Sequence, residues 1–152
     1  MNLRSKTIFC LLLTLTITAL AQMNVSLKLS GTIQRDDKSL DVKDVQLMSG
    51  EIITWSIEAI NSDSAPATDF APTAKIPAGT EYVPYSATGA SKIEFSIDGG
   101  RTYAGKPMIR ERGPDGQEHE VEAKPSLFTN VKFVHGTLSP GTVKLIYQTK
   151  VR

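Results

Sequence analysis

The sequence predicts an all-β protein, an antiparallel β-sandwich, and three observations carry that prediction. Apolar and polar residues alternate with period two in several short segments, turn-forming residues separate these segments, and no window carries the 3.6-residue stripe of an amphipathic helix. The 152 residues, 40% hydrophobic and 22% charged, fit one globular domain. Because strands with one apolar face need a second sheet to cover that face, the pattern favours a sandwich over a single sheet.

The N-terminal segment, residues 1–21, has the features of a cleaved signal peptide. Arg4 and Lys6 form a short basic region, and an apolar run extends from Thr7 to Leu20. Small residues around Ala21 suit a signal peptidase. The run is shorter than the ~20 residues that a membrane-spanning helix needs, so we favour cleavage over an uncleaved anchor. We expect residues 22–152 to form a single exported domain with no membrane span.

The predicted strands follow the period-two segments in chain order. Alternation is clear over residues 24–33, 53–59, 93–97 and 143–151. Turn signals separate the runs: Ser49-Gly50, Pro77-Ala78-Gly79, Asp98-Gly99-Gly100, Gly113-Pro114-Asp115-Gly116 and Pro140-Gly141. Trp55, inside the second of these strands, is expected at the centre of the core, because a single large aromatic residue usually packs there.

Two charged segments are predicted to lie in solvent. Residues 36–39 are expected to join the first strand to the second as a turn. Residues 110–122 are dense in charge around a Pro-Asp-Gly turn and predict a protruding hairpin or loop. In that hairpin, the expected inward residues are His119, Val121 and Ala123, and the outward residues are Glu118, Glu120 and Glu122.

Composition argues against several classes of function. Seventeen Lys and Arg residues against sixteen Asp and Glu residues give a net charge of +1, too balanced for a nucleic-acid-binding protein. The only cysteine, Cys10, lies in the predicted signal peptide, so neither a disulfide framework nor a cysteine metal site is expected. His119 and His135 have no partner ligand at zinc-site spacing. For the acidic group Asp36, Asp37, Asp41 and Asp44, we weigh calcium binding against a solvated turn and favour the turn.

The sequence carries no set of residues that predicts catalysis. It has no Gly-x-Ser-x-Gly elbow, no cysteine nucleophile outside the predicted signal peptide and no glycine-rich phosphate loop. Neither histidine has an evident Ser or Asp partner. We therefore expect a protein that is not an enzyme, with no cofactor and no resident metal.

Residues 45–152 resemble a known bacterial family. The shared features are the turn at Gly50, the strand Ile52–Asn61, Pro66-Ala67-Thr68, Pro77-Ala78-Gly79-Thr80 before Tyr82-Val83, and Leu138-x-Pro140-Gly141 before the last strand. In this order and spacing, they resemble the conserved-repeat domain of bacterial surface proteins (domain of unknown function eleven). The resemblance implies an immunoglobulin-like β-sandwich at a cell envelope, with no general catalytic activity.

The segment Ser96–Tyr103 resembles the Asp-box, a Ser-x-Asp-x-Gly-x-Thr-aromatic hairpin found in sialidase-type propellers and other secreted proteins. Asp98 can accept hydrogen bonds from backbone N–H groups while the following glycines allow the chain to reverse. We favour a structural turn here over a carbohydrate contact, since a motif match alone is only a hypothesis.

The expected function is binding of another macromolecule outside the cytoplasm. Partners are expected among envelope or surface proteins or copies of the chain itself, through an exposed strand edge or the charged hairpin. The candidate binding residues are Arg101, Tyr103, Arg110 and Arg112, where cations gather around one hairpin. A solvated edge is the other interpretation of that cluster. A different function, carbohydrate binding with Tyr82, Tyr85 or Tyr103 stacking on sugar, is the alternative.

Overall fold

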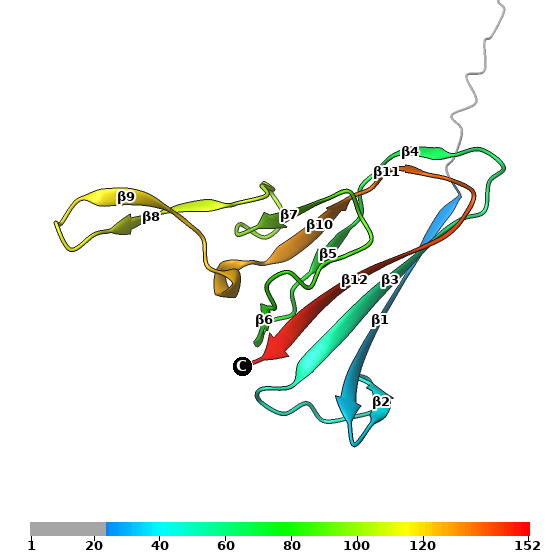
Figure 1. Cartoon of the computed structure of the whole chain (residues 1–152), viewed down its shortest axis with the longest axis horizontal. Helices are drawn as coiled ribbons and strands as arrows, with labels where there is room; N and C mark the ends of the chain where they lie inside the picture. Colours follow the sequence, from blue (N-terminus) through cyan, green and yellow to red (C-terminus); the bar gives the residue numbers. More distant parts are fainter. Residues whose placement is uncertain (1–23) are drawn as a thin grey trace, which may run out of the picture.

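The computed structural model describes residues 24–152, which form an all-β structure of antiparallel strands and confirm the predicted fold class (Figure 1). The predicted signal peptide, residues 1–21, lies outside the described residues. The elements in chain order are β1 (Val25–Arg35), β2 (Lys38–Asp41), β3 (Ile52–Asn61), β4 (Ala67–Phe70), β5 (Thr73–Lys75), β6 (Thr80–Tyr82), β7 (Lys92–Ser96), β8 (Met108–Arg112), β9 (Glu118–Glu122), the 3-10 turn η1 (Pro125–Leu127), β10 (Asn130–Val134), β11 (Gly136–Leu138) and β12 (Gly141–Val151).

The larger sheet has the strand order β2-β1-β3-β12-β6. Its long strands β1, β3 and β12 are those in which the sequence alternates most clearly. Because side chains on a strand alternate between faces, residues Ile57 and Ala59 of β3 share one face with Leu145 and Tyr147 of β12, and all four are buried. This face forms one wall of the core.

The smaller sheet, with the order β5-β10-β7, supplies the opposite wall. Val131 and Phe133 of β10 are fully buried and join the same apolar cluster as the inner face of β3 and β12. The two-stranded pair β11-β4 adds Leu138 and Phe70 to one end of that cluster. Two sheets facing each other across one apolar cluster make a β-sandwich.

The core is centred on Phe133 and Tyr147, whose ring centroids are 6.2 Å apart. Trp55 does not occupy the central position that the sequence predicted: it is half-buried and packs against the cluster from its margin. Its ring covers the backbone of Gly31 on β1, and its indole N–H donates to Thr149 Oγ1 at 2.9 Å. Because glycine has no side chain, position 31 leaves room for the Trp55 ring at the edge of the core.

The hairpin β1–β2 turns at Asp36 and Asp37, which have φ values of 48° and 59°. Two residues at positive φ fit the type I′ turn that joins paired antiparallel strands, and aspartate tolerates this conformation better than most residues. The expected turn over residues 36–39 is therefore shorter than predicted, because Lys38 and Ser39 already pair with β1.

A bidentate ion pair holds the chain that follows β2. The guanidinium of Arg35 donates to both carboxylate oxygens of Glu51, at 2.6 and 2.9 Å, and to Gln46 O at 2.6 Å. Glu51 also accepts from Met48 N–H at 2.7 Å. The hydrogen bond from Arg35, followed by that from Met48, lowers the pKa of Glu51 below its ordinary value, so the carboxylate stays charged and anchors this loop to the large sheet.

The strands β8 and β9 form a two-stranded arm that projects from the sandwich (Figure 1). We call residues 108–122 the arm. It confirms the predicted protruding hairpin, but not the inward position of His119. No residue of β8 or β9 is buried, and the His119 side chain is exposed beside Asp115, 3.0 Å away. Of the three residues expected to point inward, only Ala123, just beyond the arm, is buried.

Candidate functional site

The Asp98 loop, which follows β7, is closed by its own hydrogen bonds. Asp98 accepts from the Thr102 hydroxyl at 2.6 Å, the Ser96 hydroxyl at 2.7 Å and the Arg101 N–H at 3.0 Å. Gly100 N–H donates to Ser96 Oγ at 2.9 Å. The hydrogen bonds to Asp98, that from the Thr102 side chain above all, hold its pKa well below the ordinary range. The carboxylate is thus directed into its own loop, as expected of a structural turn.

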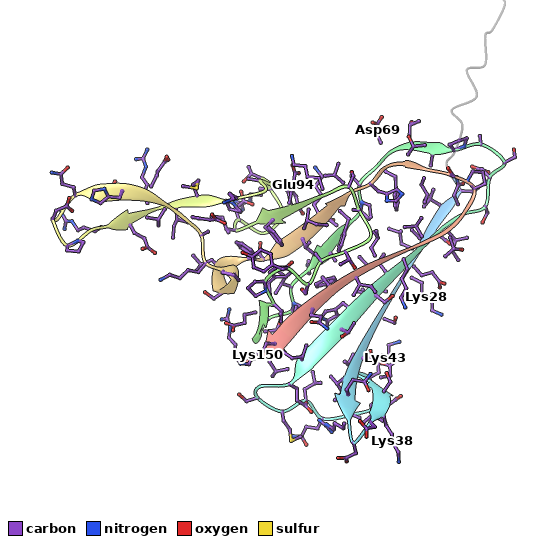
Figure 2. The ribbon with its side chains drawn as sticks, in the orientation of Figure 1. Lys28, Lys38, Lys43, Asp69, Glu94 and Lys150 are labelled. Carbon is purple, nitrogen blue, oxygen red and sulfur yellow. The ribbon has the colours of Figure 1, made fainter. Side chains whose placement is uncertain are left out.

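The first two predicted binding residues, Arg101 and Tyr103, lie in this loop. Arg101 is exposed, whereas Tyr103 is half-buried. The ammonium group of Lys132, on β10, lies 5.5 Å from the centroid of the Tyr103 ring, within cation–π range. Lys132 also forms an ion pair with Glu94 at 3.4 Å, and Figure 2 shows Glu94 on the small sheet. Tyr103 therefore belongs to a polar surface cluster, and its ring is already in contact with a cation.

The other two predicted residues, Arg110 and Arg112, lie on β8 in the arm. Successive residues of a strand point to opposite faces, so the two arginines share one face, and the register places them opposite Glu120 and Glu118 of β9. Arg112 also donates to Gly116 O at 2.9 Å, which braces the turn at the tip. This face consists of a row of cations beside a row of anions.

The structure thus divides the predicted basic cluster into two places. Arg101 and Tyr103 are near the small sheet, and Arg110 and Arg112 follow on the arm. At the base of the arm, Lys106 forms an ion pair with Glu122 at 3.2 Å. Every arginine on the paired part of the arm faces a glutamate. The arm therefore presents both signs of charge side by side, not the uniform positive charge that an anionic polymer would require.

The opposite face of the arm is partly apolar. Ile109 and Val121 are directly opposite in the register and are both half-buried. Cross-strand pairs of this kind stabilise a hairpin. Nearer the tip, the same face carries His119, whose contact with Asp115 helps to lower the pKa of that carboxyl, after the larger effect of Gln117 N–H. The arm is therefore held together by its own pairs and not by the core.

A hollow of about 500 Å³ lies where the arm joins the sandwich, and sequence analysis did not predict it. Its floor is aromatic: Phe95 stacks on Phe128 with centroids 4.5 Å apart, and Tyr82 lies 4.8 Å from Phe95. Tyr85, with 98% of its surface exposed and a φ of 62°, stands at its rim. These residues come from β6, from β7, from the segment between these two strands and, for Phe128, from the segment between η1 and β10. The only sequence signal for them was their aromatic character.

The three tyrosines weighed for sugar stacking do not form one platform. Tyr82 is buried, Tyr103 is half-buried in contact with Lys132, and Tyr85 alone among them is fully exposed. A row of exposed rings, which would favour glycan stacking, is not present among these residues.

Within residues 24–152, no three His, Cys, Asp or Glu side chains are grouped so that they could hold a metal ion. The same residues contain no helix that is long and apolar enough to cross a membrane.

No protein-family model, no curated protein and no solved structure matches the chain.

Proposed function

We propose that the protein is a non-catalytic interaction module of the bacterial cell envelope, exported after removal of residues 1–21. It binds another envelope protein or a copy of itself. The observation that carries the proposal is the arm: two paired strands extend from the sandwich without contributing a buried residue to the core. The fold does not need the surface of the arm for its own packing, so this surface is available to a partner.

The charges of the arm favour a protein partner. Arg110 and Arg112 of β8 lie opposite Glu120 and Glu118 of β9. A complementary partner surface would place anions against the arginines and cations against the glutamates. Electrostatic complementarity of this kind contributes to specificity and to the association rate more than to affinity. A nucleic acid or another polyanion would meet the acidic row as well and be repelled by it. The export and envelope location of this proposal are supported by the features of residues 1–21 and by the resemblance to bacterial surface domains.

Crosslinking in intact cells tests the proposal. The tagged chain is crosslinked, the envelope is fractionated and the adducts are identified by mass spectrometry. We expect one dominant envelope protein or self-adduct, and we expect the Arg110→Glu/Arg112→Glu variant to lose any adduct that forms through the arm. The matched control is Lys38→Glu/Lys43→Glu, which reverses two exposed cations at the far end of the molecule (Figure 2).

A charge swap separates the integrity of the arm from its recognition of a partner. The Arg110→Glu/Glu120→Arg variant keeps opposite charges across the hairpin but exchanges one of the two pairs, so that each row carries both signs. It should leave the unfolding transition unchanged and still lose the adduct. If all arm variants recover the same adducts as the wild type, the arm is not the binding surface. Recovery of the monomer alone, beside efficient control crosslinks, would contradict the interaction module itself.

Glycan binding is the second candidate, and one observation favours it: the fully exposed Tyr85 at the rim of an aromatic-floored hollow. A ring in this position can stack on a sugar face. Screening the protein against soluble glycans, with Tyr85→Ala as the test variant and Tyr103→Ala as the comparison, examines this function. Binding that Tyr85→Ala abolishes and Tyr103→Ala leaves intact would support it, and an absence of binding would exclude it.

A further inference from the structure

The outer edge of β1 is unpaired along the first half of the strand. β2 pairs with β1 only over residues 32–35. One further backbone hydrogen bond joins Val42 N–H to Gly31 O at 3.0 Å. Beyond it, the chain that follows β2 turns away from β1. From there to the start of the strand, over residues 25–30, no described residue pairs with the outer side of β1.

The geometry of the ladder shows which backbone groups are unpaired. Alternate residues of an antiparallel strand point their N–H and C=O groups to opposite sides. Since the carbonyl of Gly31 points away from β3, so do the backbone groups of Val25, Leu27 and Leu29. These residues offer a regular series of donors and acceptors, which is the template for the addition of another strand.

The side chains of the same residues are apolar and uncovered. Leu27 and Leu29 pair with Ala59 and Ile57 of β3 and share their face, yet Leu27 and Leu29 are 54% and 51% exposed, whereas Ala59 and Ile57 are buried. The reason lies in the sheet order: the small sheet covers β3 and β12, and β1 extends beyond it (Figure 1). An added strand that pairs with this edge would also bring side chains next to the two leucines.

We propose that a second copy of the chain binds here, with the two β1 strands antiparallel and Leu27 opposite Leu27. This rests on the proposed function, in which a copy of the chain is one of the expected partners. The two-fold axis of such a pair is perpendicular to the sheet, so the inner faces of both copies lie on one side. The exposed leucines of the two copies then form one continuous apolar strip.

Charge and the existing hydrogen bonds exclude the registers shifted toward Leu29, and a shift the other way would pair fewer residues of β1, which begins at Val25. Pairing Leu27 with Leu29 would place Lys28 directly opposite the Lys28 of the second copy, and like charges in that position are destabilising. Centring the pair on Leu29 would place Leu27 opposite Gly31, whose carbonyl already bonds with Val42. With Leu27 at the centre, Lys28 faces Ser26, and neither conflict arises. Figure 2 shows Lys28 on the side of the molecule away from the arm.

Disulfide trapping tests both the pairing and its register. Cys10 is the only cysteine of the chain, so single cysteines are introduced into the full-length Cys10→Ser chain, expressed for export. Residues directly opposite in a hydrogen-bonded antiparallel pair have Cα atoms ~5.5 Å apart, within disulfide range. We expect Leu27→Cys to be trapped as a covalent dimer under mild oxidation. The two copies of position 29 would be displaced by four residues, or ~13 Å along the strand, so Leu29→Cys should stay monomeric.

The control is Leu127→Cys, an exposed leucine on η1 that reports random collisions. Trapping of Leu27→Cys no faster than Leu127→Cys overturns the pairing, and preferential trapping of Lys28→Cys or Leu29→Cys overturns the register. Sedimentation of the native chain provides a second measurement: we expect a dimer that Leu27→Glu converts to a monomer with an unchanged unfolding transition. A wild-type chain that stays monomeric at every concentration also overturns the proposal.

The experiments can reject self-pairing through β1 and binding through the arm independently of each other. The Arg110→Glu/Arg112→Glu variant changes the arm and leaves β1 intact, so it should retain the trapped dimer while losing an arm-dependent envelope adduct. Loss of the Leu27 dimer with the envelope adduct intact would reject self-pairing alone. A dimer without any arm-dependent adduct would instead reject the arm as the binding surface.

Discussion

The contact between Gly31 and Trp55 gives a sharp prediction about stability. A Cβ atom added at Gly31 would lie 2.6 and 2.8 Å from two carbons of the indole ring and 3.1 Å from a methyl group of Val42. Ordinary contacts to a Cβ begin near 3.4 Å, so Gly31→Ala must displace the ring. The displacement would also strain the hydrogen bond from the Trp55 indole to Thr149 Oγ1, which is 2.9 Å long.

The size of the effect follows from three contributions. Forcing a methyl group into a filled space costs about 1–3 kcal/mol, and loss of the hydrogen bond to Thr149 costs about 0.5–1.5 kcal/mol. Replacing glycine stiffens the unfolded chain and offsets about 0.4–1 kcal/mol. Gly31→Ala should therefore lower the free energy of unfolding by about 0.5–4 kcal/mol, which corresponds to a fall in Tm of about 2–16 °C.

Urea unfolding followed by tryptophan fluorescence is the assay, because Trp55 is the only tryptophan and reports directly on the displaced ring. We expect a lower midpoint and a red-shifted native emission. Gly105→Ala is the matched control, since the nearest atom to a Cβ there is Ile93 O at 4.0 Å, and it should stay within about 0.5 kcal/mol of the wild type. If Gly31→Ala is as stable as Gly105→Ala and its emission is unchanged, the position of the Trp55 ring does not require a glycine at position 31.

Three further predictions concern the core, a turn and a loop. Phe133→Ala empties a fully buried site and should lower the free energy of unfolding by about 3–5 kcal/mol in urea titrations, whereas Leu127→Ala on the surface should have little effect. Asn61→Ala removes the side-chain N–H donor to Ala65 O and to buried Leu138 O and should cost about 1–3 kcal/mol by thermal melting; an unchanged melt would show that another donor replaces it. Asp98→Asn should lower the Tm at neutral pH. Because the folded-state pKa of Asp98 is lowered, chiefly by the Thr102 side chain, its contribution is present above the unfolded pKa of about 4 and lost as the pH falls toward the folded value. The Tm difference from the wild type should therefore shrink in acid, and a constant difference would contradict this assignment.

The long strands could be predicted because each carries enough alternating residues to define a face. The segments predicted at 53–59, 93–97 and 143–151 correspond to β3, β7 and β12. The strands β5 and β6 have three residues each, too few for a period-two pattern to emerge. They are strands because neighbouring strands pair with them, which is a tertiary effect that a local pattern does not contain.

The sequence could not predict which apolar residues of the inner face are exposed, and the reason is a different one. Leu27 and Leu29 on β1 alternate as regularly as Ile57 and Leu145, yet the first two are exposed and the last two are buried. What separates them is the width of the small sheet, which sequence alternation does not reveal. The hollow beside the arm was missed likewise, since Phe95 and Phe128 are far apart in the chain and meet only in the fold.

The ladder between β7 and β10 has a topological consequence for the arm. Ser96, the last residue of β7, pairs directly with Asn130, the first of β10, and Thr129 N–H bonds to Ser96 O at 2.8 Å. Residues 97–129, with the Asp98 loop, the arm and η1, therefore leave and re-enter the small sheet at a single rung. In engineering terms the base of the arm is an insertion point: Ala123 N–H bonds to Pro107 O at 2.8 Å, so a different hairpin could replace the residues between them while Ala104 keeps its bridge to Phe95. A new binding specificity would then require no rerouting of the strands of the sandwich.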